Sequence, residues 1–137
     1  MKAYTNLEQS KKLAKILSLE SADMYYMETS YNNYAIGVLK RMERDMLLNH
    51  AKYYKMFPCW SLAALLGILP QSITKYIEGE SCQKTFHLNL FRSYYHCVSY
   101  SFTPSVNDDN TLYCIGRDNW VDACVDMIIR LHELNLL

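Results

Sequence analysis

Histidine and cysteine are the side chains of this 137-residue sequence best suited to nucleophilic, acid–base or metal chemistry. They are His50, His87, His96, His132, Cys59, Cys82, Cys97, Cys114 and Cys124. The cysteines form no CxxC pair, and they form no cluster with the histidines at zinc-finger spacing. We therefore expect free thiols that pack as small apolar side chains in a reducing compartment.

One strand pairing brings two of these side chains together. If Leu90 pairs with Tyr94 across a turn at 91–93, His87 lies opposite Cys97 on the sheet face turned away from the helices. Two ligands begin a metal site, but no third ligand is evident, and exposed cross-strand neighbours are the simpler interpretation. The same register places His96 on the core face. The sequence thus predicts no catalytic residue, no metal and no cofactor, and an enzyme would need a pocket that joins such distant residues.

Phosphate-binding loops are not indicated either. The four glycines are isolated from one another, whereas a phosphate loop needs a glycine-rich turn that runs into a helix. Neither a GxSxG elbow nor an HExxH pair occurs. Nucleotide binding of the phosphate-loop kind is therefore excluded.

One cluster of basic residues leaves nucleic-acid binding open. Its members are Lys40, Arg41, Arg44, Lys52 and Lys55. Glu43 and Asp45 interrupt it, so a solvated helix face is the competing interpretation. Residues 1–58 carry nine Lys and Arg against six Asp and Glu, and residues 59–137 carry five against eight. This imbalance is too mild to indicate a polyanionic partner.

Tyrosine is abundant, with twelve copies. Its ring is apolar and its hydroxyl tolerates water, so tyrosine is common at interfaces. We expect Tyr76, Tyr95 and Tyr113 on an exposed sheet face, where they would stack on bases or form a dimer interface.

Helices are predicted in the first half of the chain. Thr5 and Glu8 fit a capping box for a helix over residues 6–17. Residues 31–34 are typical of a turn, and the apolar period after it favours a helix over 39–52, although YAIGVLK fits a strand as well.

The segment PCWSLAALLGILP at 58–70 predicts a short helix. Leucines 62, 65, 66 and 69 form one stripe, Ser61 is a plausible N-cap, and Pro70 ends the helix. Four leucines on one stripe are seldom left in water, which favours a core wall over a docking helix.

The second half alternates with a period of two. Strands are predicted around 73–77, 86–90, 94–102 and 112–115, with a polar loop at 104–110. A C-terminal helix follows, capped by Asn119. The predicted fold class is α+β, an antiparallel three- to four-stranded meander packed against a long C-terminal helix and shorter N-terminal helices. We expect a single domain over 1–137, with a helical part at 1–57 and a helix–meander–helix core at 58–137.

No apolar run approaches the roughly 18–20 residues that span a bilayer, and lysines interrupt the amphipathic opening segment. We therefore expect a cytoplasmic protein without a membrane partner.

Three segments together resemble a known family. They are TNLEQSKKLAKILSLESADMYY at 5–26, PCWSLAALLGILP at 58–70 and DNWVDACVDMIIRLHELNLL at 118–137. In this order they are similar to small proteins of unknown function from Bacteroides-type gut bacteria and their phages and mobile elements. The resemblance implies a cytoplasmic accessory protein of phage-related origin and brings no catalytic residues. Trp120 departs from it, because proline would be expected there.

Two functions remain. The leading hypothesis is a non-catalytic protein-interaction protein, with another protein or a second copy of itself as partner. The alternative is a nucleic-acid-binding module that uses the basic residues between 40 and 55.

Overall fold

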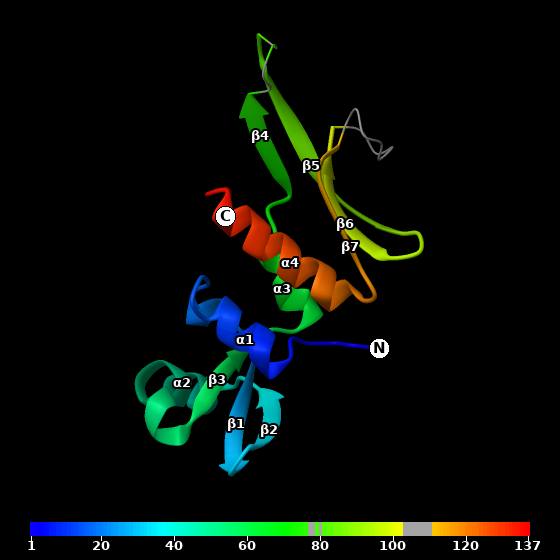
Figure 1. The fold of residues 1–137 in the computed structure, drawn as a ribbon. Coiled ribbons are helices and arrows are strands. Elements are labelled where there is room, and N and C mark those ends of the chain that lie inside the picture. Colours follow the sequence, from blue (N-terminus) through cyan, green and yellow to red (C-terminus); the bar gives the residue numbers. More distant parts are fainter. Residues whose placement is uncertain (77–78, 80, 103–110) are drawn as a thin grey trace. The chain divides into compact units, whose positions relative to one another are not determined.

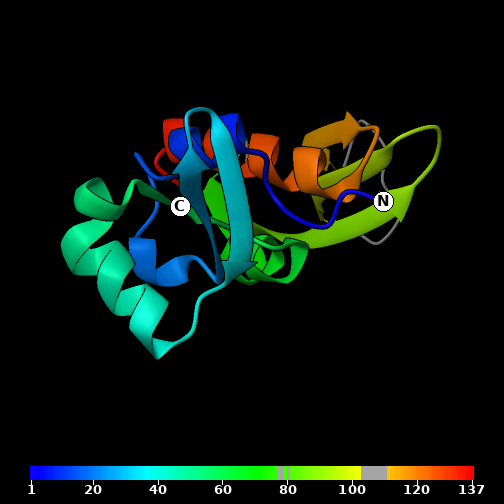
Figure 2. The same ribbon diagram turned by 90° about the horizontal axis from the view of Figure 1, so that it is seen from below.

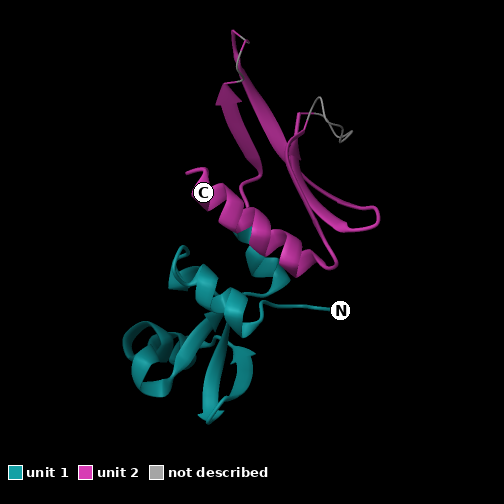
Figure 3. Ribbon diagram, viewed as in Figure 1, with its two compact units in different colours: residues 1–68 teal, residues 69–137 magenta. Residues whose placement is uncertain are grey.

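The computed structural model describes residues 1–76, 79, 81–102 and 111–137. The chain divides into two compact units, Met1–Ile68 (unit 1) and Leu69–Leu137 (unit 2) (Figure 3). Each unit contains its own antiparallel sheet and at least one helix (Figure 1). Because residues 59–68 carry no charge, the excess of positive charge falls in unit 1 and the excess of negative charge in unit 2. The single domain expected over 1–137 stays a prediction.

Unit 1 is built from seven elements. In chain order they are α1 (Leu7–Leu13), a 3-10 helix (Leu19–Ser21), β1 (Met24–Ser30), β2 (Asn33–Val38), α2 (Arg41–Tyr54), β3 (Met56–Cys59) and α3 (Leu62–Ile68). The strands form one antiparallel sheet in the order β2-β1-β3. Strands β1 and β2 make a hairpin, and its turn contains Asn32 with φ 57° (Figures 1 and 2). The turn at 31–34 is thus confirmed, but the expected helical part at 1–57 contains three strands as well.

Helix α1 begins one residue later than predicted. The Gln9 amide donates to Asn6 Oδ1 at 2.8 Å, and the Asn6 amide donates to Gln9 Oε1 at 3.1 Å. Asn6 and Gln9 therefore form the capping box that the sequence assigned to Thr5 and Glu8. The helix is also shorter than the predicted 6–17, because it ends at Leu13.

Thr5 is instead part of a buried polar network that ties the N-terminal segment to β3. Its hydroxyl accepts the Trp60 amide at 3.2 Å and lies 2.7 Å from Ser10 Oγ. Its carbonyl accepts the Tyr26 hydroxyl at 2.8 Å, and the Cys59 thiol lies 3.5 Å from its hydroxyl. Buried polar groups cost free energy unless they are paired, so this network fixes where the N-terminal segment crosses the sheet.

Helix α3 follows directly from β3 and is capped as predicted. The Ala64 amide donates to Ser61 Oγ at 3.2 Å. The Ser61 amide and hydroxyl in turn donate to the Asp23 carboxylate, which suits the positive end of a helix. Of the predicted leucine stripe, Leu65 and Leu69 are fully buried and the other two leucines are half-buried.

Unit 2 is a four-stranded meander with one long helix. The strands are β4 (Ser72–Tyr76), β5 (Gln83–Arg92), β6 (His96–Ser101) and β7 (Thr111–Arg117), paired in that order. Helix α4 (Trp120–Glu133) packs on β6 and β7. This arrangement confirms the α+β fold class with an antiparallel meander and a C-terminal helix. The predicted loop at 104–110 lies outside the described residues.

The strand pairing in unit 2 differs from the predicted one. Leu90 pairs with Val98 instead of Tyr94, so the β5–β6 register is displaced by four residues. Tyr94 lies in the turn and is 99% exposed, where the sequence placed it on the core face. A displacement by an even number of residues keeps all the remaining side chains of the two strands on their predicted faces.

The core of unit 2 lies between α4 and one face of the meander. His96 contacts the ring of Trp120 at 4.9 Å between centroids, which identifies this face. Fully buried members from the two sides are Val98, Tyr100, Val121, Cys124, Met127, Ile128 and Leu131. Each such apolar side chain contributes roughly 1.5–3 kcal/mol. The Tyr100 hydroxyl donates to the Pro70 carbonyl at 2.7 Å and is thereby paired inside the core.

Candidate functional site

The five predicted nucleic-acid residues lie on and beside α2, but they do not form one patch. Lys40 and Arg41 stand at its start, and Lys52 and Lys55 stand at its end. Arg41 and Lys52 are eleven positions apart, which corresponds to about 16 Å of helix. His50 interrupts the regular helix with φ −137°, ψ 19°, so the last turn is not continuous with the rest.

Two of these five residues are engaged inside unit 1. The Arg44 guanidinium donates to the carbonyls of Glu20 and Ala22, both at 3.2 Å, and so fixes α2 to the 3-10 helix segment. Lys55 Nζ lies 3.3 Å from the Glu28 carboxylate. The three that make neither an ion pair nor a side-chain hydrogen bond with any described residue are Lys40, Arg41 and Lys52, which stand at opposite ends of the helix. This is a poor phosphate-binding face for a duplex.

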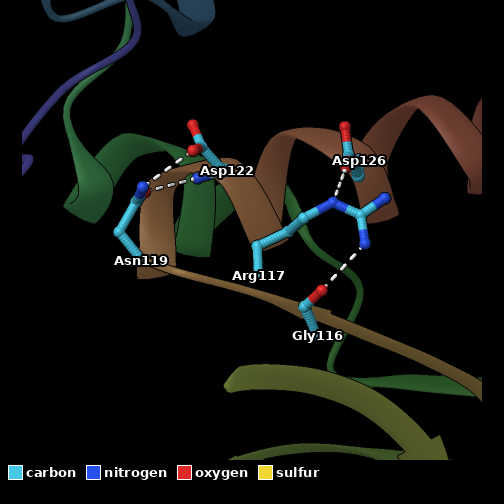
Figure 4. Close-up of polar contacts among 5 residues, drawn as sticks. All are labelled: Gly116, Arg117, Asn119, Asp122 and Asp126. Atoms are coloured by element: carbon cyan, nitrogen blue, oxygen red, sulfur yellow. Dashed lines mark hydrogen bonds and ion pairs between the residues drawn. The ribbon is translucent and has the colours of Figure 1, made fainter. Parts of the chain in front are cut away.

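The N-terminus of α4 is occupied by its own side chains (Figure 4). Asn119 caps the helix by accepting the Asp122 amide at 2.9 Å, and its amide donates to the Asp122 carboxylate at 2.7 Å. Arg117 Nε donates to Asp126 at 2.5 Å, and another guanidinium nitrogen donates to the Gly116 carbonyl at 2.8 Å. Arg117, the cation next to this helix start, is therefore neutralised by Asp126. The carboxylates of the first helical turns would repel a phosphate.

The predicted pair of His87 and Cys97 does not form. His87 pairs with Ser101, while Cys97 pairs with Phe91 four residues further along β5. Four residues of strand correspond to about 13 Å, which is too far for a shared ligand or proton. No group of three or more metal-ligating side chains occurs among residues 1–76, 79, 81–102 and 111–137.

The thiols are free, and three of the five are buried. Burial raises the pKa of the Cys59 thiol, and this outweighs the hydrogen bonds from Thr5 and Ser10 that would lower it. Burial also raises the pKa of Cys124 to about 12. Thiols whose pKa is raised stay protonated at neutral pH and are poor nucleophiles.

The tyrosines expected on the exposed sheet face divide between the two faces. Tyr76 and Tyr95 are exposed. Tyr113 pairs with Tyr100 on the face that α4 covers, where its hydroxyl accepts from Lys75 at 3.4 Å. A common stacking face of these three tyrosines therefore does not exist.

Strand β2 is an edge strand, and the structure pairs it with β1 on one side only. In an antiparallel pair, residues that exchange both backbone bonds with the neighbouring strand alternate with residues that point these groups away. The Leu39 amide donates to the Asp23 carbonyl at 2.9 Å, and the register is regular from there to Tyr34. Tyr34, Ile36 and Val38 therefore point their N–H and C=O groups away from β1.

This edge also lacks the usual protection. Natural sheet edges carry charges or prolines that discourage pairing with another chain. Strand β3 contains Pro58, β4 contains Lys75 and β7 contains Arg117, whereas β2 reads NYAIGV. Within the part of the chain that the structure describes, β2 is the one sheet edge with neither charge nor proline. The sequence left YAIGVLK open between a helix and a strand, so periodicity alone did not identify this edge.

Aromatic side chains gather at the C-terminal end of α2. A hollow of about 450 Å³ is lined by residues 27–31 and 53–55, which include Tyr31, Tyr53 and Tyr54. A second hollow of about 370 Å³ shares Glu28 and Lys55 with it and is also lined by Lys52.

Comparison with family models, with curated proteins and with solved structures found no match to this chain. Among the described residues, no helix is long and apolar enough to cross a membrane.

Proposed function

We propose that this protein is a non-catalytic interaction protein that forms a homodimer by pairing the β2 strands of two copies. The observation that supports the proposal is the uncharged edge of β2, on which Val38 is 62% and Ile36 is 36% exposed. In this proposal the protein is a cytoplasmic accessory protein of the Bacteroides and phage family that its three segments resemble.

The register of the pairing follows from symmetry. Two identical strands pair antiparallel around a twofold axis, and a continuous sheet keeps each side chain on the same face in both copies. Residues with outward backbone groups must also face one another. One register meets both conditions over the whole strand: Ile36 faces Ile36 of the second copy, and Tyr34 faces Val38. Both contacts are between apolar side chains, on one face of a six-stranded sheet.

The expected dimer is weak. Tyr34, Ile36 and Val38 of each copy exchange six backbone hydrogen bonds, worth about 0.5–1.5 kcal/mol each. Apolar cross-strand pairs add roughly 0.2–1 kcal/mol each. Association costs about 4–15 kcal/mol in lost freedom, so the balance favours a dimer that dissociates on dilution.

Sedimentation equilibrium over a concentration series tests the proposal. We expect a concentration-dependent dimer that Ile36→Lys abolishes, because the two lysines would face each other across the axis. The matched control is Met42→Lys, which adds the same charge at an exposed apolar side chain on α2 and should leave the dimer intact. A monomer at every concentration would refute the proposal.

Crosslinking tests the register itself. Facing residues of a hydrogen-bonded pair have Cα atoms about 5.5 Å apart, within the range of a disulfide. In a Cys82→Ser, Cys114→Ser background, which removes the exposed thiols, Ile36→Cys should form a disulfide-linked dimer on mild oxidation. Met42→Cys should not. Dimers in sedimentation without the residue 36 crosslink would show that another surface is used.

A further inference from the structure

The hollow formed by residues 27–31 and 53–55, here called the tyrosine hollow, lies between the tip of the β1–β2 hairpin and the end of α2. Its volume falls within the range of about 300–1,000 Å³ typical of ligand sites. Three tyrosines from two distant parts of the chain contribute to it. None of this arrangement is needed to pair the β2 edge.

The rings are held in place but left open. Tyr53 and Tyr54 meet edge to face, with centroids 5.0 Å apart and planes at 89°. His50 also meets Tyr54 edge to face, with ring centroids 6.3 Å apart. Yet Tyr31 is 88% exposed, Tyr53 82% and Tyr54 40%. Exposed aromatic rings grouped around a hollow indicate a surface that binds a ligand with a planar ring by stacking.

The backbone explains why these rings converge. The kink at His50 ends the regular part of α2, and Lys55 takes the left-handed conformation with φ 50° and ψ 51°. The chain then enters β3, which pairs with β1, and the Glu28 amide donates to the Lys55 carbonyl at 3.2 Å. Residues 53–55 are thereby fixed against residues 27–31.

Charge decides the class of ligand. A cage for a quaternary ammonium group combines aromatic rings with a net negative environment. Here the Glu28 carboxylate is only 15% exposed and is paired with Lys55, and it also accepts the Asn32 amide at 3.2 Å. Lys52 in the adjoining hollow leaves a net positive charge. Segment 40–55 holds the five basic residues against Glu43 and Asp45, and the rest of unit 1 is balanced, four against four.

A nucleotide combines both features that this surface would recognise, a flat aromatic base and a negatively charged phosphate. We propose that the tyrosine hollow binds single-stranded nucleic acid, with unpaired bases stacked on Tyr31 and Tyr53 and the neighbouring phosphate held by Lys52. Bases inside a duplex are already stacked on each other and cannot reach such rings. The dispersed basic residues of α2 likewise offer no continuous track for a duplex backbone.

Fluorescence anisotropy with labelled oligonucleotides of about 12 residues, as single-stranded RNA, single-stranded DNA and duplex DNA, tests the proposal. We expect the single strands to bind more tightly than the duplex. Tyr53→Ala and Tyr31→Ala should each weaken single-strand binding about 5- to 150-fold, which corresponds to the loss of one stacked base. Tyr53→Phe, which keeps the ring, should bind nearly as well as the original protein.

Two controls distinguish base stacking in the tyrosine hollow from non-specific electrostatic attraction to the oligonucleotide. Tyr94→Ala removes a tyrosine that is more exposed still, in unit 2, and should leave binding unchanged. Raising salt from about 50 to 200 mM should weaken binding only about threefold for each neutralised phosphate. Absence of single-strand binding, preference for the duplex, or equal loss in Tyr53→Ala and Tyr94→Ala would each overturn the proposal. Because both tyrosines are largely in solvent, their removal should not unfold the protein, which circular dichroism would verify.

Discussion

The buried hydroxyl of Thr5 provides a quantitative test of how unit 1 is held together. Thr5→Val keeps the shape of the side chain and replaces only the hydroxyl by a methyl group. The Trp60 amide, which donates to this hydroxyl at 3.2 Å, would then lose its partner in the interior, and Ser10 Oγ would lose the contact at 2.7 Å. A buried polar group left without a partner costs about 1–3 kcal/mol. We therefore expect the free energy of unfolding to fall by about 2–4 kcal/mol.

The assay is urea unfolding followed by tryptophan fluorescence. The chain has two tryptophans, Trp60 in unit 1 and Trp120 in unit 2, so a Trp120→Phe background makes the signal report on unit 1. The matched control, read by circular dichroism, is Thr74→Val, because Thr74 is exposed and its hydroxyl contacts Thr85 at the surface. The control should change stability by no more than about 0.5 kcal/mol. If Thr5→Val costs as little as the control, the network does not stabilise the fold.

Three further outcomes follow from single contacts. Arg44→Ala should lower the free energy of unfolding by about 1–2 kcal/mol in urea, because two carbonyls lose a charged donor, whereas Arg41→Ala should stay within about 0.5 kcal/mol. Since burial raises the Cys124 pKa from its ordinary 9.0 to about 12, the unfolded state releases this proton first, and stability should fall as pH rises from 9 toward 12. Cys124→Ala should flatten that decline in alkaline denaturation curves. In a thiol titration with a disulfide reagent at neutral pH, exposed Cys82 should react at once and buried Cys59 only as the protein unfolds.

Local signals in the sequence were enough to predict helices α3 and α4 and their N-caps. Asn119 caps α4 and Ser61 caps α3 as predicted, because in each case the side chain satisfies an amide two or three residues ahead. The prediction of the α1 cap was wrong because Thr5 and Asn6 are both cap-forming residue types, and the cap is Asn6. The deciding partner of Thr5 is the amide of Trp60, 55 positions away, which no local pattern contains.

Strand β1 was not predicted, and β2 was left open as an alternative to a helix, for a similar reason. Residues 24–30 mix methionine and tyrosine without alternation, and Gly37 weakens the strand pattern of residues 33–38. In the structure the Tyr25 ring lies where a Cβ at residue 37 would be, so the glycine accommodates the ring of its neighbour on β1. Strand β1 also pairs with β3, whose residues follow α2 in the chain. A pairing between segments this far apart depends on tertiary packing.

The failed pair of His87 and Cys97 shows which parts of a site periodicity can predict. A period of two fixes the face on which each side chain lies, and a register displaced by four residues preserves every face. His96 and Val98 therefore lie on the core face in both registers, and the fold class was insensitive to the error. Proximity along the strands is different, because each residue of displacement moves the partner by about 3.3 Å. A displacement of four residues moves two facing ligands about 13 Å apart, too far for a shared site. A cross-strand site can therefore be predicted only where the turn that sets the register is known. The β2 pairing proposed above depends on register in the same way, which is why a crosslink at Ile36 is a stronger test of it than dimer formation alone.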